Sequence, residues 1–213
     1  MFYWIKTSRF IKWIFRNQVW SIPNQDNKIY LTFDDGPTPE VTQWVLAELQ
    51  RQKIKATFFC IGKNIEQNPE VFDKIIQEGH TIGNHTFNHL NGWKTTTLDY
   101  INDTKECEYQ IRTNPLLKGS SQLFRPPYGK ITKQQSKKLR KLGYKIIMWD
   151  VLTADFDASI SPEKCFENAT QKVRVGSIIV FHDSKKAFSN IQYVLPKAIA
   201  FYKNKGFIFD SIS

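Results

Sequence analysis

The stretch KIYLTFDDGP, residues 28–37, runs from an apolar segment straight into a pair of aspartates and a Gly-Pro turn. Residues 28–33 predict a β-strand, because aliphatic and aromatic side chains follow Lys28 without another charge. Residues 39–49 then show the spacing of an amphipathic helix, and residues 55–62 return to an apolar run typical of a strand. This order of strand, helix and strand opens an α/β domain.

The same alternation continues to the end of the chain. Further strands are expected at 81–85, from 123 into the proline-rich loop that ends at 129, at 144–151 and at 176–181, and the segment 206–212 closes the chain. Helices are expected at 69–80, 95–112, 133–143, 161–173 and 191–202, where Pro196 must kink or start the helix. About seven β/α units without a long linker predict a single domain, either barrel-like or doubly wound. In both architectures the functional loops lie at the carboxyl ends of the strands.

The composition is that of a folded domain. With 41% hydrophobic residues among 213 and a mean hydropathy of −0.43, the chain is neither a disordered nor a polytopic membrane protein. The net charge of +10 suggests an anionic partner, such as a membrane surface, a cell-wall polymer or nucleic acid. Nucleic acid is the least favoured, because the sequence has no finger, zipper or RNA-binding signature. Three widely spaced cysteines are expected to be buried apolar residues, namely Cys60, Cys107 and Cys165.

Residues 1–26 form a basic, aromatic segment ahead of a domain at 27–213. Four cations divide its apolar residues, namely Lys6, Arg9, Lys12 and Arg16. The apolar stretches between them are too short for a secretion signal or a transmembrane span, so we expect the chain to be cytoplasmic or peripheral to a membrane. Two interpretations of the segment stay open: a short helix on an anionic membrane or cell envelope, and a helix packed on the domain. The basic run 130–145 likewise fits a solvated surface or an envelope contact.

Polar residues that interrupt the apolar pattern collect at the expected carboxyl ends of strands. They are Asp34, Asp35, His85, His89, Arg125, Tyr128, Asp155, His182 and Asp183. Three of the four histidines of the chain belong to this set. The remaining one, His80, is expected to be a buried, hydrogen-bonded residue.

The segment HTFNH predicts a metal site. On a helical turn, His85 and His89 would face the same side and bind one ion, with a carboxylate as third ligand. The adjacent aspartates supply that carboxylate, because two like charges this close disfavour each other unless one of them binds a cation. The other aspartate then remains an ionised base beside a Lewis acid, as metal-assisted hydrolysis requires.

Five ordered motifs resemble those of carbohydrate esterase family 4, the polysaccharide deacetylases with a domain of the nodulation-factor deacetylase (NodB) type. They are TFDDGP at 32–37, HTFNH at 85–89, RPPYG at 125–129, DF at 155–156 and IVFH at 179–182. The resemblance covers residues 28–210 and implies a distorted (β/α) barrel of about seven strands. It also implies hydrolysis of N-acetyl groups from glycans that contain N-acetylglucosamine, such as peptidoglycan or chitin-like oligosaccharides, with release of acetate.

The resemblance assigns the metal ligands and the base. Asp35, His85 and His89 correspond to the ligands of one divalent ion, zinc first, with cobalt or nickel as alternatives. Asp34 corresponds to the general base, and Arg125 to the residue that orients it. Without the resemblance, Arg125 would be read as a residue that closes a loop.

The resemblance also assigns the acid and the pocket walls. His182 corresponds to the general acid, and Asp155 to the residue that orients it, although an aspartate there also suits a helix cap. The backbone N–H of Tyr128 is expected to bind the oxyanion, with Pro127 and Phe156 beside the substrate.

The fourth motif departs from the family pattern. Leu152 stands where an acidic residue is usual, and Phe156 stands where a tryptophan is usual. These changes are expected to alter the shape of the pocket rather than the chemistry. Two alternatives to glycan deacetylation stay open: hydrolysis of another amide or cyclic ureide on the same fold, and an inactive glycan-binding envelope protein.

Overall fold

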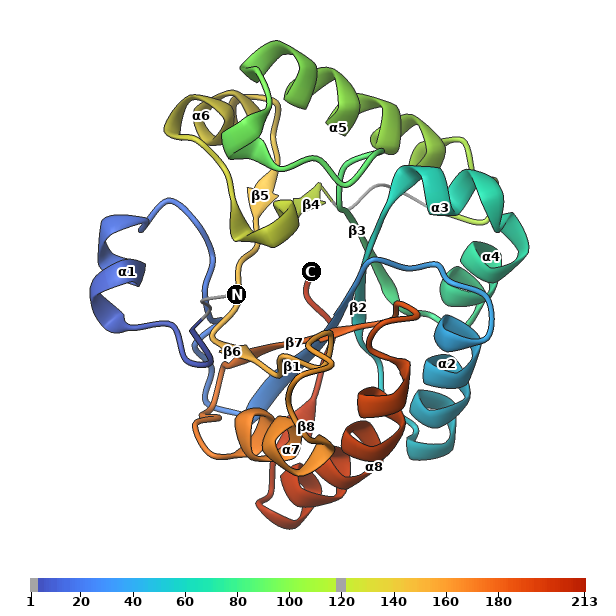
Figure 1. Ribbon diagram of the computed structural model, residues 1–213, viewed down its shortest axis with the longest axis vertical. Helices are drawn as coiled ribbons and strands as arrows, with labels where there is room; N and C mark the ends of the chain where they lie inside the picture. The colour runs from blue at the N-terminus through green and yellow to red at the C-terminus, as the bar shows by residue number, and fades with distance from the viewer. Residues whose placement is uncertain (1–3, 118–121) are drawn as a thin grey trace.

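Strand β1 (Lys28–Asp34) lies in the middle of a parallel sheet and is buried from Ile29 to Asp34. In the computed structural model, which describes residues 4–117 and 122–213, the strands follow the order β5-β4-β3-β2-β1-β7-β6, and β8 pairs with the start of β1. The other strands are β2 (Thr57–Cys60), β3 (Thr81–Asn84), β4 (Leu123–Phe124), β5 (Lys145–Ile146), β6 (Val151–Leu152), β7 (Ile178–His182) and β8 (Ile208–Phe209). The sheet curls into a half-barrel (Figure 1), so the expectation of a distorted barrel of about seven strands is confirmed.

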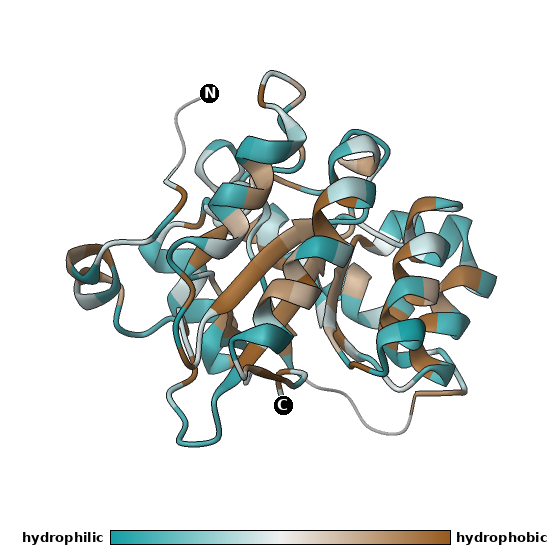
Figure 2. Cartoon of the chain, turned by 90° about the horizontal axis from the view of Figure 1, so that it is seen from below, coloured by the Kyte–Doolittle hydropathy of each residue, from teal (hydrophilic) through white to brown (hydrophobic). Residues whose placement is uncertain are grey.

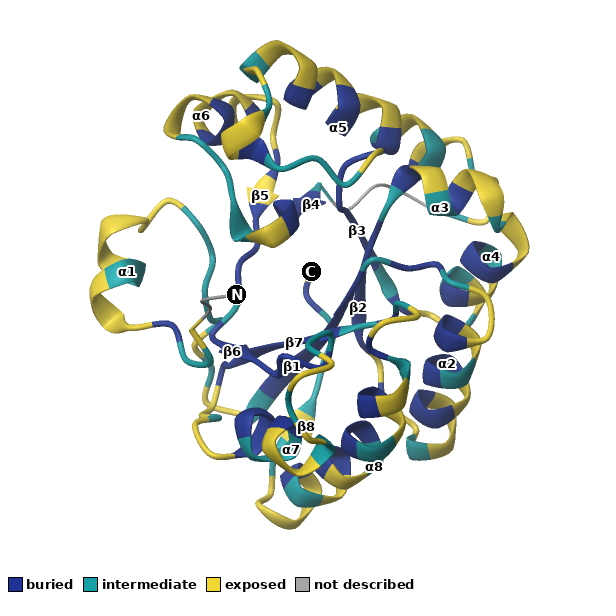
Figure 3. Cartoon of the chain, in the orientation of Figure 1, coloured by how far each residue is buried: buried dark blue, intermediate teal, exposed yellow. Residues whose placement is uncertain are grey.

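Helices surround the outside of the sheet (Figure 1). They are α1 (Arg9–Ile14), α2 (Val41–Gln52), α3 (Gly62–Gln67), α4 (Pro69–Gln77), α5 (Thr97–Arg112), α6 (Lys133–Lys141), α7 (Pro162–Thr170) and α8 (Phe188–Asn204), with short 3-10 turns η1 (Gly92–Lys94) and η2 (Pro127–Gly129). The hydrophobic sheet lies between polar helix surfaces (Figure 2), and the buried residues line the strands and the inner helix faces (Figure 3). Within this core, the Phe33 ring stacks on those of Phe58 and Phe181, with centroids 5.0 and 5.8 Å apart.

The N-terminal strap, residues 4–22, bonds to the two edge strands of the sheet. The N–H groups of Thr7 and Leu152 donate to the carbonyls of Asp150 and Ile5, at 3.0 and 2.9 Å. Further along the strap, the Val19 N–H donates to the Ile146 carbonyl at 2.8 Å, and the Val19 carbonyl accepts the Met148 N–H at 2.7 Å. The buried Asp150 carboxylate accepts hydrogen bonds from Lys6 and Lys12, which are themselves only about one fifth exposed. The strap is therefore fixed to the domain, and residues 1–3 of the predicted segment lie outside the described residues.

Two sequence expectations need correction. The apolar run 144–151 is two strands, because β5 pairs with β4 whereas β6 pairs with β7 on the other side of the sheet. Between them, the Met148 N–H donates to the Val19 carbonyl of the strap, and the Met148 carbonyl accepts a hydrogen bond from the buried Arg125. The end of the expected strand 55–62 is the start of helix α3. Of the two alternatives for Pro196, the structure excludes the helix start, because Pro196 lies inside α8.

The expectations about the buried cysteines and His80 are confirmed. All three cysteines are free and buried. His80 is buried and its Nδ1 accepts the N–H of Ala56 at 3.2 Å. Within the described residues, no helix is long and apolar enough to span a bilayer.

Candidate active site

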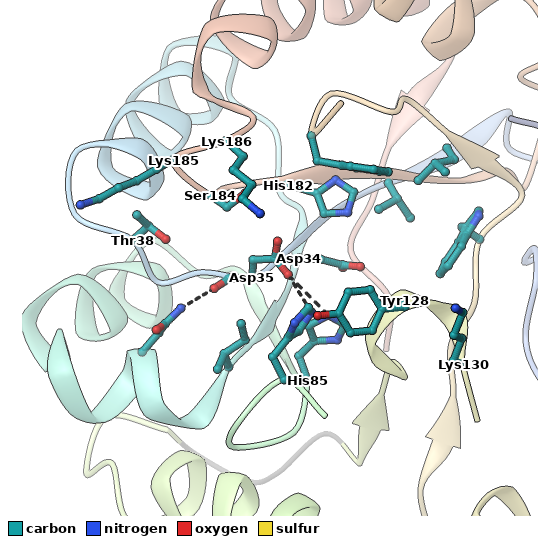
Figure 4. Close-up of a pocket in the computed structure, with 17 residues that line it drawn as sticks. Asp34, Asp35, Thr38, His85, Tyr128, Lys130, His182, Ser184, Lys185 and Lys186 are labelled. Atoms are coloured by element: carbon teal, nitrogen blue, oxygen red, sulfur yellow. Dashed lines mark hydrogen bonds and ion pairs between the residues drawn. The ribbon is translucent and has the colours of Figure 1, made fainter. Parts of the chain in front are cut away.

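A pocket of about 630 Å³ opens at the carboxyl ends of the strands (Figure 4). Six of the side chains singled out from the sequence line it, namely Asp34, Asp35, His85, His89, Tyr128 and His182. They come from the ends of four different strands and from the loops that follow them, which parallel pairing brings to one end of the sheet. The expectation that these residues meet at one rim is therefore confirmed.

The two aspartates lie in different environments. Asp34 is the last residue of β1 and is 3% exposed, whereas Asp35 stands in the following loop with a left-handed φ of 84°. The reversed backbone turns the Asp35 side chain toward His85 and His89 (Figure 4). Burial alone would raise the pKa of Asp35, but the hydrogen bond from His89 and the nearby imidazoles hold it well below its usual range.

The two histidines face one another from a loop rather than from a helical turn, which corrects the sequence prediction. Residues 85–89 follow β3 without helical structure, and Thr86 and His89 have φ values of 65° and 55°. Such conformations are costly for residues other than glycine and are found at functional sites. The loop still places the imidazole rings 5.1 Å apart.

The three side chains fit a divalent metal ion. Asp35 Oδ1 lies 3.7 Å from His85 Nε2 and 3.3 Å from His89 Nε2. Ligand atoms held about 2.1 Å from a tetrahedral zinc ion stand roughly 3.4 Å apart, so these spacings suit one ion. The His85 Nδ1 lies 2.8 Å from the Arg125 carbonyl oxygen, which leaves Nε2 for coordination, and burial lowers the pKa of His85 to about 4, so the imidazole is neutral. Among the histidine, cysteine, aspartate and glutamate side chains of the described residues, Asp35, His85 and His89 form the group whose ligand atoms lie close enough to bind one ion.

Arg125 is fully buried and pairs with Asp34 across 2.6 Å. Two further N–H groups of the guanidinium donate to the carbonyls of Ile147 and Met148, at 3.2 and 3.0 Å. An arginine held on three sides cannot move away from its carboxylate, so it fixes the orientation of Asp34. The pairing expected from the resemblance is present.

His182 ends β7 and is bonded to Asp155, which is fully buried. Its Nδ1 lies 2.7 Å from Asp155 Oδ1, and its backbone N–H donates to Oδ2 at 2.8 Å. Burial opposes a charged imidazole, but the Asp155 carboxylate outweighs it and raises the pKa of His182 to about 9. Asp155 does not cap the following helix, because the N-cap of α7 is Ser161.

The pocket walls agree only in part with the sequence expectation. Phe156 lines the pocket and packs edge-on against His182, with ring centroids 4.8 Å apart, and Leu152 lines the pocket as well.

Tyr128 has a φ of 60°, and the centroid of its exposed ring lies 4.6 Å from that of His89. Within the described residues, the Tyr128 N–H has no hydrogen-bond acceptor, whereas the next two N–H groups are bonded. Pro127 is buried and is not among the described residues that line the pocket, which corrects its placement beside the substrate.

Two carboxylates support the loops of the site: Asp103, which the sequence reasoning missed, and Asp183, which it placed at the rim without a role. Asp103 on α5 accepts the N–H groups of Phe87 and Asn88, at 2.7 and 3.0 Å, and so holds the histidine loop. Asp183 accepts the N–H of Gly36 at 3.0 Å and the hydroxyl of Thr42 at 2.5 Å, and so holds the aspartate loop. A signal existed for Asp103, because it falls on the buried face of its helix, where an acid needs partners.

The comparisons with known proteins agree with this site. The family pattern described as polysaccharide deacetylase matches residues 21–147. A peptidoglycan-N-acetylglucosamine deacetylase of Bacillus cereus is 33% identical over 199 residues, covering 91% of this chain and 90% of that protein. A chitooligosaccharide deacetylase of Azorhizobium caulinodans is 34% identical over 170 residues, covering 76% of each. Other relatives are longer, and this chain spans 33% of a Listeria monocytogenes peptidoglycan-N-acetylglucosamine deacetylase.

The solved structures give the same result. The crystal structure of a peptidoglycan N-acetylglucosamine deacetylase in complex with 4-naphthalen-1-yl-N-oxidanyl-benzamide matches with a TM-score of 0.87 at 32% identity, over 94% of both chains. Together with the family pattern, which covers more than half of this chain, this match extends the resemblance from five motifs to the whole fold. The chain belongs to the polysaccharide deacetylases of carbohydrate esterase family 4.

Proposed function

We propose that the protein is a metal-dependent hydrolase that removes N-acetyl groups from glycans containing N-acetylglucosamine. The observation that carries this proposal is the pairing of Asp34 with His182, which are register partners on the neighbouring strands β1 and β7. Both line the pocket that also contains the Asp35, His85 and His89 cluster. A base and an acid thus stand beside one candidate metal site.

The residues divide the work of amide hydrolysis. Asp34, oriented by Arg125, accepts a proton from the attacking water. His182, kept protonated by Asp155, donates a proton to the sugar nitrogen as the C–N bond breaks, so that water and acetamide become acetate and a free amine. The unbonded N–H of Tyr128 is available to the oxyanion of the tetrahedral intermediate. The metal, for which we propose zinc with cobalt or nickel as alternatives, would be held by Asp35, His85 and His89 and would supply Lewis-acid polarisation of the carbonyl and of the water.

The margins of the pocket favour a glycan that carries acidic groups. Lys130 lies on one side of the site, and Lys185 and Lys186 lie on the other (Figure 4). None of the three forms an ion pair with the described residues. Unpaired cations beside a binding site favour anionic ligands. We therefore propose peptidoglycan-type glycans, whose peptide and lactyl groups carry carboxylates, ahead of neutral chitin oligomers.

The test is a panel of N-acetylated glycans, from chitin oligomers to peptidoglycan fragments, in which acetate and new primary amines are both counted. Equal amounts of the two products from at least one glycan are expected, because one amide bond gives one of each. Acetate release from none of the glycans, under conditions where the protein holds its metal, would overturn the proposal.

The same panel separates the alternatives. A hydrolase of another amide or cyclic ureide would leave every glycan intact and act on small amides added to the panel. An inactive glycan-binding protein would bind a glycan without releasing acetate. The complete set of base, acid and ligand side chains in the pocket favours catalysis over binding alone.

A further inference from the structure

The N-terminal strap exposes large apolar side chains on its outer side. Phe10 is 66% exposed and Trp13 is 69% exposed, and their rings stack with centroids 6.2 Å apart. Ile14 and Phe15 beside them are exposed as well, and no residue of α1 is buried. Figure 2 shows this hydrophobic turn projecting from the molecule, and Figure 3 shows it exposed. Apolar side chains this exposed in the described part of the chain indicate an external contact.

The charges around this cluster all have one sign. The first acidic residue of the chain is Asp26, so the whole strap is free of carboxylate side chains. Arg9 and Arg16 flank the apolar cluster, are exposed, and form no ion pair with the described residues. A surface with aromatic side chains between exposed arginines complements one that offers both apolar depth and negative charge.

The strap is held in the orientation that keeps this cluster outward. Lys6 and Lys12 point inward to Asp150, and the backbone on both sides of α1 bonds to the edge strands. The cluster is therefore presented by a fixed support, so little conformational freedom has to be lost when it binds.

We propose that the strap surface, Phe10, Trp13, Ile14 and Phe15 with Arg9 and Arg16, docks on a lipid bilayer that contains anionic lipids. The aromatic and aliphatic side chains enter the boundary between headgroups and acyl chains, and the arginines bind lipid phosphates. Insertion of side chains from a short turn gives a peripheral and reversible attachment. This inference is independent of the proposed deacetylation, because none of the six residues lines the pocket.

The test is sedimentation of the full chain with vesicles of phosphatidylcholine alone, and with vesicles in which about one third of the lipid is phosphatidylglycerol. We expect binding to the anionic vesicles that weakens with salt. The double variant Phe10→Ala, Trp13→Ala and the double variant Arg9→Gln, Arg16→Gln should each lose about tenfold in affinity or more. A matched control replaces the equally exposed Leu98 and Tyr109 on α5 by alanine and should bind like the wild type.

Several results would overturn the inference. The first is that the wild type binds neither the neutral nor the anionic vesicles. The second is that the strap variants bind the anionic vesicles as tightly as the wild type. The third is that the α5 control loses as much affinity as the strap variants. Light scattering on the same samples identifies the competing occupants. A dimer that the strap variants abolish would make the surface an interface between two copies, and binding to an acidic cell-wall polymer in preference to vesicles would make it a wall contact. Unchanged circular dichroism shows that the variants are folded.

Discussion

Two consecutive aspartates face different partners because the backbone reverses between them. Asp34 keeps the extended backbone of β1 and faces Arg125, whereas the left-handed conformation of Asp35 sends its carboxylate to the histidines. In an extended chain, neighbouring side chains point in opposite directions, and this turn allows both to line one pocket. This difference predicts that substitution of Asp34 and substitution of Asp35 have different effects on turnover and on metal binding.

Replacing Asp34 by asparagine should lower turnover by roughly a hundredfold or more while leaving metal binding largely intact, since only the positioned base is lost. Metal content per chain and the rate of acetate release measure the two effects. Asp35→Ala is the matched variant and should lose the metal first. Near-normal turnover of the Asp34 variant would mean that the roles are exchanged.

The His182–Asp155 pair predicts the alkaline limit of activity. A general acid works only while it holds its proton, so the rate should fall as pH rises through the His182 pKa of about 9. Asp155→Asn removes the charge that raises this pKa and should move the alkaline limb of kcat to lower pH, with the acid limb nearly unchanged. A pH–rate profile in which the alkaline limb stays in place would show that another group sets it.

At the scale of elements, the sequence predicted those strands and helices whose side-chain pattern is local. The run 28–33 and the helix 95–112 agree closely with β1 and α5, because burial of one face leaves a period in the sequence. The motifs could also be placed at one rim, since parallel strands align their carboxyl ends.

The sequence predictions that were wrong depend on contacts between residues far apart in the sequence. The division of 144–151 into two strands arises because β5 pairs with β4 whereas β6 pairs with β7, and no local pattern records these pairings. The histidine loop is not helical because Asp103 and its own left-handed residues shape it. The pairing of the strap with both edge strands is equally absent from the periodicity of residues 1–26.

The contact between α5 and the histidine loop gives a prediction for stability. Asp103→Ala leaves the buried N–H of Phe87 and the partly buried N–H of Asn88 without acceptors, so the free energy of unfolding should fall by about 2–3 kcal/mol. Metal affinity should drop about tenfold or more, because the loop that carries both histidines is loosened. Urea unfolding and zinc titration measure these effects. Glu106→Ala, an exposed acid on the same helix, should change neither, and an equal loss in both variants would contradict the assignment.

At the scale of the whole molecule, Asp150 connects the N-terminal strap to the segment that precedes β7. It receives Lys6 and Lys12 from the strap and the Ser177 hydroxyl, at 2.5 Å, from the segment before β7. Asp150→Ala should lower the free energy of unfolding by about 2–3 kcal/mol, since it removes a buried carboxylate from under two ammonium groups. Denaturant unfolding measures this loss.

The control for Asp150 is the partly exposed pair of Lys28 and Asp210, whose charged groups are 3.1 Å apart. Asp210→Ala should cost less than about 1 kcal/mol, because exposed ion pairs contribute little. Similar losses from the two variants would mean that Asp150 does not anchor the strap.

We propose that deacetylation depends on one metal ion held by Asp35, His85 and His89. The most direct measurement is the rate of acetate release from an N-acetylated glycan as zinc is added back to the chelated protein. The rate should rise from near zero in proportion to zinc and level off at about one ion per chain, and the double variant His85→Ala, His89→Ala should stay inactive at every zinc level. Full activity of the chelated protein, or restoration of the double variant by zinc, would contradict the account.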